Sequence, residues 1–253
     1  MVLLGLETTT RHASVALADE QGLIASARTG RGGRHGEFVA PAIDFCRREA
    51  GIGLEALTGV AVSLGPGLFT GMRVGIATAQ AIAHARGLPV VGLASLDLVA
   101  FGARHTRRRI CAVIDARRGE VAWAHYEPAP GGVQRRSEPR LGAPERLAGE
   151  LEDAGGEVLC VGDGALAHRS ALEATRAGIA DEAAAYPSAE SLLALARPRF
   201  ARGETSRPEE LAPLYLRRPD ARLGWQQRGA LHGGVGGAPA VVEGSAGGAE
   251  GAS

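Results

Sequence analysis

The sequence contains no lysine, so all 28 of its residues in the lysine and arginine class are arginines. A Walker A loop needs a lysine that reaches the phosphates, and Schiff-base enzymes need a lysine amine as nucleophile. The missing lysine therefore excludes a standard phosphate-binding P-loop and lysine-based covalent catalysis.

The sequence also lacks long hydrophobic runs and any excess of one charge. No apolar run approaches the roughly 20 residues that a membrane-spanning helix needs. The 28 arginines are balanced by 28 acidic residues, which leaves no overall basic charge for nucleic acid. Residues 2–7 have the pattern of a strand with an early carboxylate and do not resemble a signal peptide. We expect a cytoplasmic protein.

Cysteine is scarce, and histidine is not spaced for a metal. Cys46, Cys111 and Cys160 lie far apart among apolar residues, which predicts reduced thiols in the core. No two of the seven histidines are four residues apart, so no helix presents the pair of imidazoles found in many zinc sites. A G-x-S-x-G nucleophile motif is also missing. The sequence predicts no metal and no other cofactor.

The most informative segment follows the apolar run 60–64. It reads Gly65-Pro66-Gly67-Leu68-Phe69-Thr70-Gly71-Met72-Arg73-Val74-Gly75. A strand, a glycine-rich turn and a helix start in this order are typical of a functional loop at the edge of an α/β sheet. Gly65, Gly67 and Gly71 are spaced one residue too far for the dinucleotide motif G-x-G-x-x-G.

Two interpretations of this segment remain open. The free N–H groups at the start of the following helix can attract an anion. Alternatively, the segment is a tight connection in which Pro66 fixes one backbone angle, the glycines permit positive φ, and Thr70 caps the helix.

The expected helix 71–86 is small and apolar on nearly all sides. One narrow stripe carries Arg73, Ala77, Gln80 and His84, and most other positions are aliphatic. Such a helix is typically covered on both sides. It either lies centrally in the core, or it packs on the sheet with one side and on a partner helix with the other, since small residues allow close approach.

The pattern of expected elements occurs twice along the chain. The first copy comprises strands at 2–8, 12–18 and 22–29, a helix at 37–48, a strand at 59–64, helix 71–86, a strand at 88–92 and a helix at 95–104. The second comprises strands at 110–115, 121–126 and 132–137, a helix at 143–154, a strand at 157–161 and a helix from about Ala165. The sequence identity between the copies is negligible, so the repeat is architectural.

This repeat predicts an α/β protein of two duplicated ribonuclease-H-like domains, the plan shared by actin, Hsp70 and sugar kinases (ASKHA). We predict an N-terminal domain at 1–106, a C-terminal domain at 107–222, and a disordered Gly/Ala-rich tail at 223–253. A helix at 188–203, with Ser188 as its N-cap, is expected to pack back on the body.

In the actin-like plan, carboxylates that end the first strand of each half handle metal and phosphate. Glu7 and Asp115 occupy these positions. The loop after Glu7 is Thr8-Thr9-Thr10, without a glycine that would let backbone approach a phosphate. Glu7 and Asp115 are therefore weak candidates for nucleotide or phosphate binding, and acidic residues that merely end strands remain the alternative.

The glycine segment resembles the signature G-P-G-S-F-T-G-L-R-I-G of the bacterial TsaB (YeaZ) family. The opening Leu3-Leu4-Gly5-Leu6-Glu7-Thr8, His35 before the first helix, the run from Ile114 to Val121, and Tyr215-Leu216-Arg217 are also similar to that family. The resemblance covers about residues 1–220. The chain departs from the pattern with Glu7 in place of Asp, with Leu68 in place of Ser, and with its tail.

The resemblance implies a non-catalytic subunit with the fold of TsaD, the catalytic and metal-binding protein that it binds and activates. With the ATPase TsaE, the two install threonylcarbamoyl on the adenosine beside the anticodon in tRNAs that read A-starting codons. The resemblance also implies a possible homodimer, and tRNA contact through the complex. TsaD binding is expected through helices of the N-terminal domain, at Phe38, Phe69, Met72, Arg73, Ile76 and Gln80.

An enzyme remains the alternative. It would be an ATP-dependent phosphotransferase or hydrolase of the actin-like class that uses Glu7 and Asp115.

Overall fold

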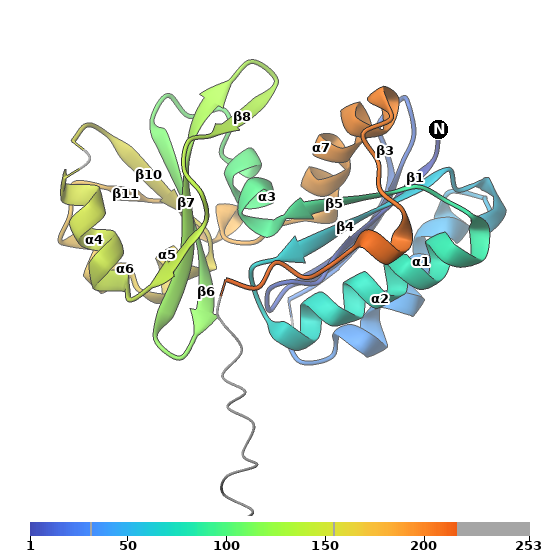
Figure 1. Ribbon diagram of the computed structural model, residues 1–253, viewed down its shortest axis with the longest axis horizontal. Helices are drawn as coiled ribbons and strands as arrows, with labels where there is room; N and C mark the ends of the chain where they lie inside the picture. Colours follow the sequence, from blue (N-terminus) through green and yellow to red (C-terminus); the bar gives the residue numbers. More distant parts are fainter. Residues whose placement is uncertain (31, 154, 217–253) are drawn as a thin grey trace, which may run out of the picture. The chain divides into compact units, whose positions relative to one another are not determined.

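The computed structural model describes residues 1–30, 32–153 and 155–216 (Figure 1). The predicted tail at 223–253 lies outside the described residues. Within them, no helix is both long enough and apolar enough to cross a bilayer.

The first half of the chain forms a five-stranded sheet in the order β3-β2-β1-β4-β5. Its strands are β1 (Leu3–Glu7), β2 (Ala13–Ala18), β3 (Leu23–Thr29), β4 (Gly59–Gly65) and β5 (Val90–Ala94). The first three form an antiparallel meander, whereas β4 and β5 run parallel to β1. Helices cross over between the parallel strands, because a tight turn cannot connect them.

The second half repeats this arrangement. Its strands are β6 (Arg109–Arg117), β7 (Glu120–Ala129), β8 (Gly132–Arg135), β9 (Arg140–Gly142), β10 (Val158–Val161) and β11 (Gly178–Ile179). The path β8-β7-β6-β10-β11 has the same order and the same directions as the first sheet, with β9 added beside β7. The predicted pair of ribonuclease-H-like units is therefore confirmed. The short β9 and β11 were not predicted.

Helices cover both faces of the first sheet. On one face lie α1 (His35–Glu49) and α2 (Phe69–Arg86), and on the other lies α7 (Ala189–Arg202). The strand side chains alternate between the two cores: Leu4 packs toward α1 and α2, and Leu3 packs toward α7. The predicted packing of the 188–203 helix on the body is observed.

The second sheet is covered by shorter helices. Its outer face carries α4 (Pro144–Asp153) and α6 (Arg169–Glu173), with α5 (Asp163–Ala167) after β10. Its other face packs on α3 (Ser95–Gly102), whose Leu98 also reaches the core of the first sheet. Cys46, Cys111 and Cys160 are buried free thiols, as predicted.

After α7 the chain returns along the first half as an extended segment, residues 204–216, which we call the C-terminal strap. Ser206 exchanges two backbone hydrogen bonds with Val90, and the Leu214 N–H donates to the Leu64 carbonyl at 2.8 Å. Short 3-10 turns occur at Leu54–Ala56, Glu182–Ala184 and Pro208–Glu210. The domain boundaries stay a prediction, but α7 and the strap, which belong to the predicted range 107–222, pack on the first sheet.

Two predicted helix caps have different outcomes. The Ser188 side chain accepts a hydrogen bond from the Ser191 N–H and caps α7, as predicted. The prediction for Thr70 is wrong, because α2 begins at Phe69 with Leu68 as its N-cap and without a side-chain cap.

Three glycines of the signature segment lie against the end of β1. We call this contact between Gly67, Gly71 and Gly75 and the pair Thr8 and Thr9 the glycine seam. A Cβ atom at Gly67 would collide with the carbonyl oxygen of Thr9. A Cβ atom at Gly71 would collide with the carbonyl oxygen of Thr8, and one at Gly75 would collide with the Thr8 hydroxyl. The Thr8 hydroxyl donates to the Gly71 carbonyl at 2.7 Å, and the Leu68 N–H donates to the Thr9 carbonyl at 2.6 Å.

The glycine seam supports the packing interpretation of the signature. The space beside the glycines is filled by the chain's own Thr8 and Thr9, with carbonyl oxygens facing Gly67 and Gly71 and a hydroxyl facing Gly75. The glycines therefore allow close packing of α2 on the sheet, and anion binding at the start of α2 stays a prediction. Gly65, at φ 99°, gives the backbone conformation that turns β4 into this segment.

Replacing a seam glycine should cost stability through collision with backbone, which cannot move aside like a flexible side chain. We expect Gly71→Ala to lower the free energy of unfolding by about 3 kcal/mol in urea titrations. Gly149→Ala is the matched control, because Gly149 lies in α4 with open space at its Cβ position. That control should be neutral or stabilising by up to about 1 kcal/mol. Equal effects of the two substitutions would contradict the packing role.

Candidate functional site

The first candidate site is the junction between the two sheets, where Glu7 ends β1. Glu7 is completely buried, and its Oε1 accepts hydrogen bonds of 2.6 Å from both the N–H and the hydroxyl of Thr9. Its Oε2 has no hydrogen-bond partner among the described residues, and neither has the buried Ser63 hydroxyl. Burial raises the pKa of Glu7, and the hydrogen bonds from Thr9 oppose that shift.

Two aspartates of the second half belong to the same region. Asp163 begins α5, and its Oδ1 accepts a hydrogen bond of 3.0 Å from the Asp115 N–H. Burial, followed by the charge of Asp115, raises the pKa of Asp163 to about 6, although hydrogen bonds to its carboxylate act in the opposite direction. The charge of Asp163 in turn raises the pKa of Glu7. Glu7, Asp115 and Asp163 together form what we call the acidic junction.

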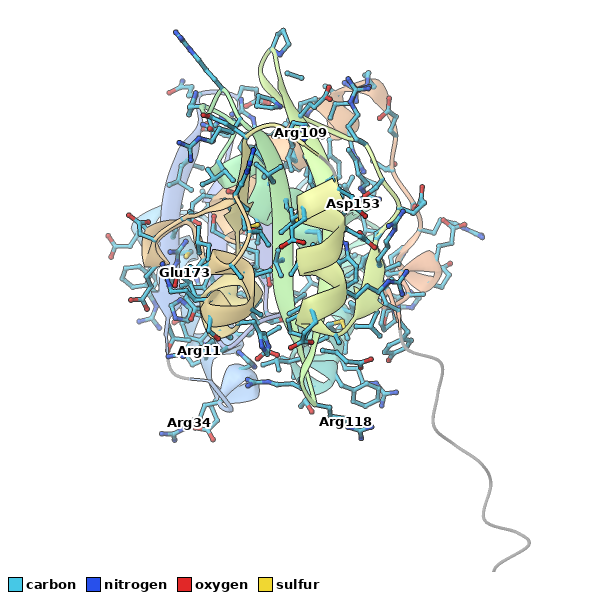
Figure 2. The ribbon with its side chains drawn as sticks, turned by 90° about the vertical axis from the view of Figure 1, so that its left-hand side faces the viewer. Arg11, Arg34, Arg109, Arg118, Asp153 and Glu173 are labelled. Carbon is cyan, nitrogen blue, oxygen red and sulfur yellow. The ribbon has the colours of Figure 1, made fainter. Side chains whose placement is uncertain are left out.

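The carboxylate of Asp115 interacts with Arg117 in the turn between β6 and β7. Its Oδ1 accepts from the Arg117 N–H at 2.8 Å, and its Oδ2 lies 3.3 Å from the Arg117 guanidinium. The hairpin turns through Arg117 and Arg118, both with positive φ, and Arg118 lies near its tip (Figure 2). Each such non-glycine residue costs about 1 to 2 kcal/mol of conformational energy.

The chemistry of the acidic junction does not favour nucleotide phosphates. Three neighbouring carboxyl groups disfavour an anion, and the loop after Glu7, Thr8-Thr9-Thr10, has no glycine for close backbone contact. Within residues 1–30, 32–153 and 155–216, no group of three or more His, Cys, Asp or Glu side chains is arranged to hold a metal. Asp163 links Glu7 and Asp115 in one region, and their assignment as weak nucleotide or phosphate candidates stays a prediction.

The second candidate site is the outward face of α2 at its N-terminal end. Phe69 and Tyr215 are 54% and 46% exposed, and their ring centroids lie 5.7 Å apart. The Arg73 guanidinium stacks over the Phe69 ring at 3.8 Å and donates to the Tyr215 hydroxyl at 3.2 Å. These three side chains, from α2 and from the C-terminal strap, form what we call the aromatic cluster.

The outward face continues along α2 with small side chains. Ala77 and Ala81 follow Arg73 at intervals of four residues, and both are exposed. Exposed alanines in a row give a flat helix surface on which another helix can pack closely. The aromatic cluster and these alanines, which we call the α2 face, form one continuous stripe.

The predicted set of partner-binding residues needs correction. Met72 and Ile76 are only 3% and 4% exposed, because the glycine seam turns this side of α2 toward the sheet, and the prediction that they contact a partner is wrong. Gln80 donates to the Pro208 and Leu211 carbonyls at 3.1 and 3.3 Å, so it holds the C-terminal strap. Phe38 is half-buried against the core.

Phe69 and Arg73 remain accessible, and Thr70 is exposed beside them. Tyr215, Ala77 and Ala81 were not predicted to belong to the partner surface. The spacing of 69, 73, 77 and 81 at four residues could have identified the stripe, whereas nothing local predicts Tyr215, which is 142 residues from Arg73.

The raised pKa of Asp163 predicts a pH dependence of stability. The carboxyl group of Asp163 binds a proton more tightly in the folded state than in the unfolded state. Protonation of Asp163 therefore stabilises the fold fully below pH 3.8, and this stabilisation is lost as the pH rises through about 6. Between pH of about 4 and 7, the wild type should lose up to about 3 kcal/mol of unfolding free energy relative to Asp163→Asn, which cannot titrate. Denaturant titrations of both proteins across this range measure the difference, and a difference that does not change with pH would be inconsistent with the buried acid.

Comparisons with known proteins identify the family. Residues 31–225 match the family model of TsaD, tRNA N6-adenosine threonylcarbamoyltransferase. The tRNA threonylcarbamoyladenosine biosynthesis protein TsaB of Escherichia coli is 32% identical over 220 residues, which cover 86% of this chain and 95% of that protein. TsaB of Bacillus subtilis is 25% identical over 89% of this chain and 98% of its own length.

A solved structure supports the same assignment. A protein of Pseudomonas aeruginosa, described as similar to the peptidase YEAZ, superposes with a TM-score of 0.77 at 33% identity, covering 85% of this chain and 99% of that protein. The glycine segment, the duplicated sheets and these similarities over nearly whole chains agree. The chain belongs to the TsaB (YeaZ) family, whose named members act in the biosynthesis of threonylcarbamoyladenosine in tRNA.

Proposed function

We propose that this protein is a non-catalytic subunit that binds a catalytic protein of the TsaD family through its α2 face and thereby activates it. TsaE, a small ATPase, joins the two, and tRNA is bound through the assembled complex. The complex transfers threonylcarbamoyl to the adenosine beside the anticodon in tRNAs that read A-starting codons. The same face can pair two copies of this chain when the partner is missing.

The observation that carries the proposal is the aromatic cluster. Phe69 and Tyr215 are two of the six large hydrophobic side chains that are well exposed in the described residues, and they lie side by side. Arginine and aromatic side chains dominate the binding energy of protein interfaces. Here Arg73 holds both rings in place, so little conformational freedom is lost on binding.

The alanines of the α2 face support a helix as the partner element. A partner helix can approach Ala77 and Ala81 closely, and its larger side chains can pack beside them. Small exposed residues also make the surface sensitive to any bulky charge placed there, which gives the proposal a direct test.

A non-catalytic role agrees with the acidic junction. The signature glycines pack on Thr8 and Thr9, and the carboxylate of Asp115 is engaged by Arg117. The chain then contributes binding surface, and the partner contributes the chemistry.

The first test replaces an alanine of the α2 face by a long cation. Ala77→Arg should weaken binding to the cognate TsaD-family protein about 30-fold or more, equivalent to about 2 kcal/mol of binding free energy. The reason is that removing an unpaired guanidinium from water at the interface is unfavourable. Binding is measured by calorimetry, and modification by nucleoside analysis of tRNA in a reconstituted reaction. Both should fall together.

The control for this test is Ala194→Arg, which places the same side chain at an exposed alanine in the middle of α7. It should leave binding, modification and unfolding free energy unchanged. Full binding by Ala77→Arg, or equal losses in both variants, would contradict the proposal. If Ala77→Arg converts a homodimer to a monomer but leaves partner binding intact, the α2 face serves self-association only.

The enzyme alternative has a separate test. An ATP-dependent phosphotransferase or hydrolase would use Glu7 and Asp115 in the acidic junction. We expect the isolated chain to show no magnesium-dependent ATP binding in calorimetry, and Asp115→Asn to support tRNA modification at the wild-type rate, since this substitution keeps the shape of the side chain. Tight Mg-ATP binding that is lost in Asp115→Asn would favour the enzyme and overturn the non-catalytic role.

A further inference from the structure

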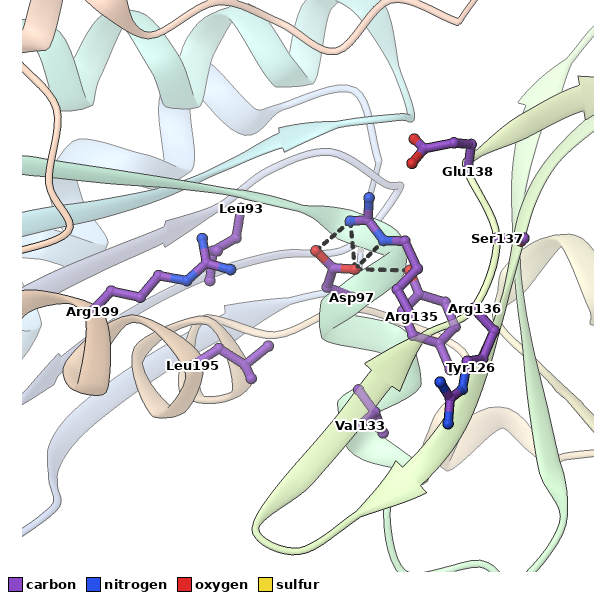
Figure 3. A pocket seen from close by; sticks show the side chains of 10 residues that line it. All are labelled: Leu93, Asp97, Tyr126, Val133, Arg135, Arg136, Ser137, Glu138, Leu195 and Arg199. Carbon is purple, nitrogen blue, oxygen red and sulfur yellow. Dashed lines mark hydrogen bonds and ion pairs between the residues drawn. The ribbon is translucent and has the colours of Figure 1, made fainter.

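A cavity of about 640 Å³ lies between the end of α7 and the β8 hairpin (Figure 3). Its size is in the range of small-molecule binding sites. One side is lined by residues of β5, of α3 and of α7, which packs on the first sheet, and the other side by residues of β7, β8 and the segment before β9. None of the lining residues belongs to α2, so the cavity is separate from the α2 face.

One wall of the cavity is held rigidly by hydrogen bonds. The Arg135 guanidinium donates to both carboxylate oxygens of Asp97, at 2.6 Å to each from Nη2 and at 3.0 Å from Nε to Oδ1. The buried Tyr126 hydroxyl donates to the same Oδ1 at 2.8 Å. Asp97 and Arg135 therefore neutralise each other, and Asp97 has little capacity left for a ligand.

Two opposite charges in the cavity have no partner inside it. Arg199 on α7 and Glu138 before β9 make no side-chain hydrogen bond and no ion pair in the part of the chain that the structure describes, and the positive charge of Arg199 helps to lower the pKa of Glu204 just after α7. Figure 3 shows them on opposite sides of the cavity. The third arginine of the lining, Arg136, is paired with Glu127: its Nε donates a hydrogen bond of 2.8 Å to Oε2 of Glu127.

Between these charges the cavity offers aliphatic surface. Leu195 on α7 and Leu93 on β5 lie on one side, and Val133 of β8 lies on the other. A simple anion does not fit this environment, because Glu138 repels it and two of the three arginines are already paired. The two charges without a partner in the cavity add up to zero, with the positive one and the negative one well separated.

We propose that this cavity binds a small zwitterion, with its carboxylate at Arg199, its ammonium group at Glu138 and its aliphatic part on Leu195 and Val133. A free amino acid and a short peptide share this chemistry. Because the ligand would contact α7, which packs on the first sheet, and β8 of the second sheet, it stabilises the folded state, and the effect is independent of any partner at the α2 face.

The test uses the full chain in thermal unfolding and calorimetry, with L-leucine, alanyl-leucine and alanyl-alanyl-leucine as probes up to about 10 mM. We expect at least one probe to raise the unfolding temperature in proportion to its concentration. Its N-acetylated form and its C-terminal amide should each bind at least about tenfold more weakly, because each loses one charge-assisted contact. The length of the best probe distinguishes a free amino acid from a peptide.

Variants locate the binding. Arg199→Gln and Glu138→Gln should each weaken the active probe at least about tenfold. The controls are Arg197→Gln on the same helix, where Arg197 donates to the Glu20 carbonyl outside the cavity, and Glu145→Gln on α4, and both should leave binding unchanged. No response to any probe, an equal response to acetate or inorganic phosphate, or full binding in both cavity variants would overturn the proposal.

Discussion

The contact between the glycines of α2 and the backbone of Thr8 and Thr9 is the constraint on which the functional surface depends. With no side chains at Gly67, Gly71 and Gly75, the helix can lie directly on the end of β1. This fixes the rotation of α2 about its own axis. Met72 and Ile76 enter the core, and Phe69 and Arg73 are left outside.

The same contact accounts for the glycines of the signature segment. Carbonyl groups of Thr8 and Thr9 lie where side chains at Gly67 and Gly71 would be, and the buried Glu7 lies directly before them in the chain. The two surfaces that we propose for binding are the α2 face and the cavity beside α7.

Much of the architecture could be predicted from local patterns. Apolar strands, turn residues and helix periodicity gave the duplicated order of elements, because each signal is contained within a few residues. The orientation of α2 could not be predicted, since aliphatic and small residues surround this helix on nearly all sides and its pattern does not identify the side that faces the sheet. The assignments of Met72 and Ile76 to a partner failed for this reason.

Contacts between distant parts of the chain account for the other differences. Gln80 and Arg73 bind carbonyl and hydroxyl groups of the C-terminal strap more than 120 residues away, and no local pattern indicates such pairs. The pairing of Arg135 with Asp97, and the position of Arg199 opposite Glu138, also depend on how the two sheets meet α3 and α7.

Hydrogen–deuterium exchange of the chain with and without its cognate TsaD-family protein would show whether α2 and the C-terminal strap form the partner surface. We predict slower exchange of backbone amides in both segments when the partner is added, with no change in α4 on the second sheet. Unchanged exchange in α2, together with protection of the second sheet or its helices, would contradict it.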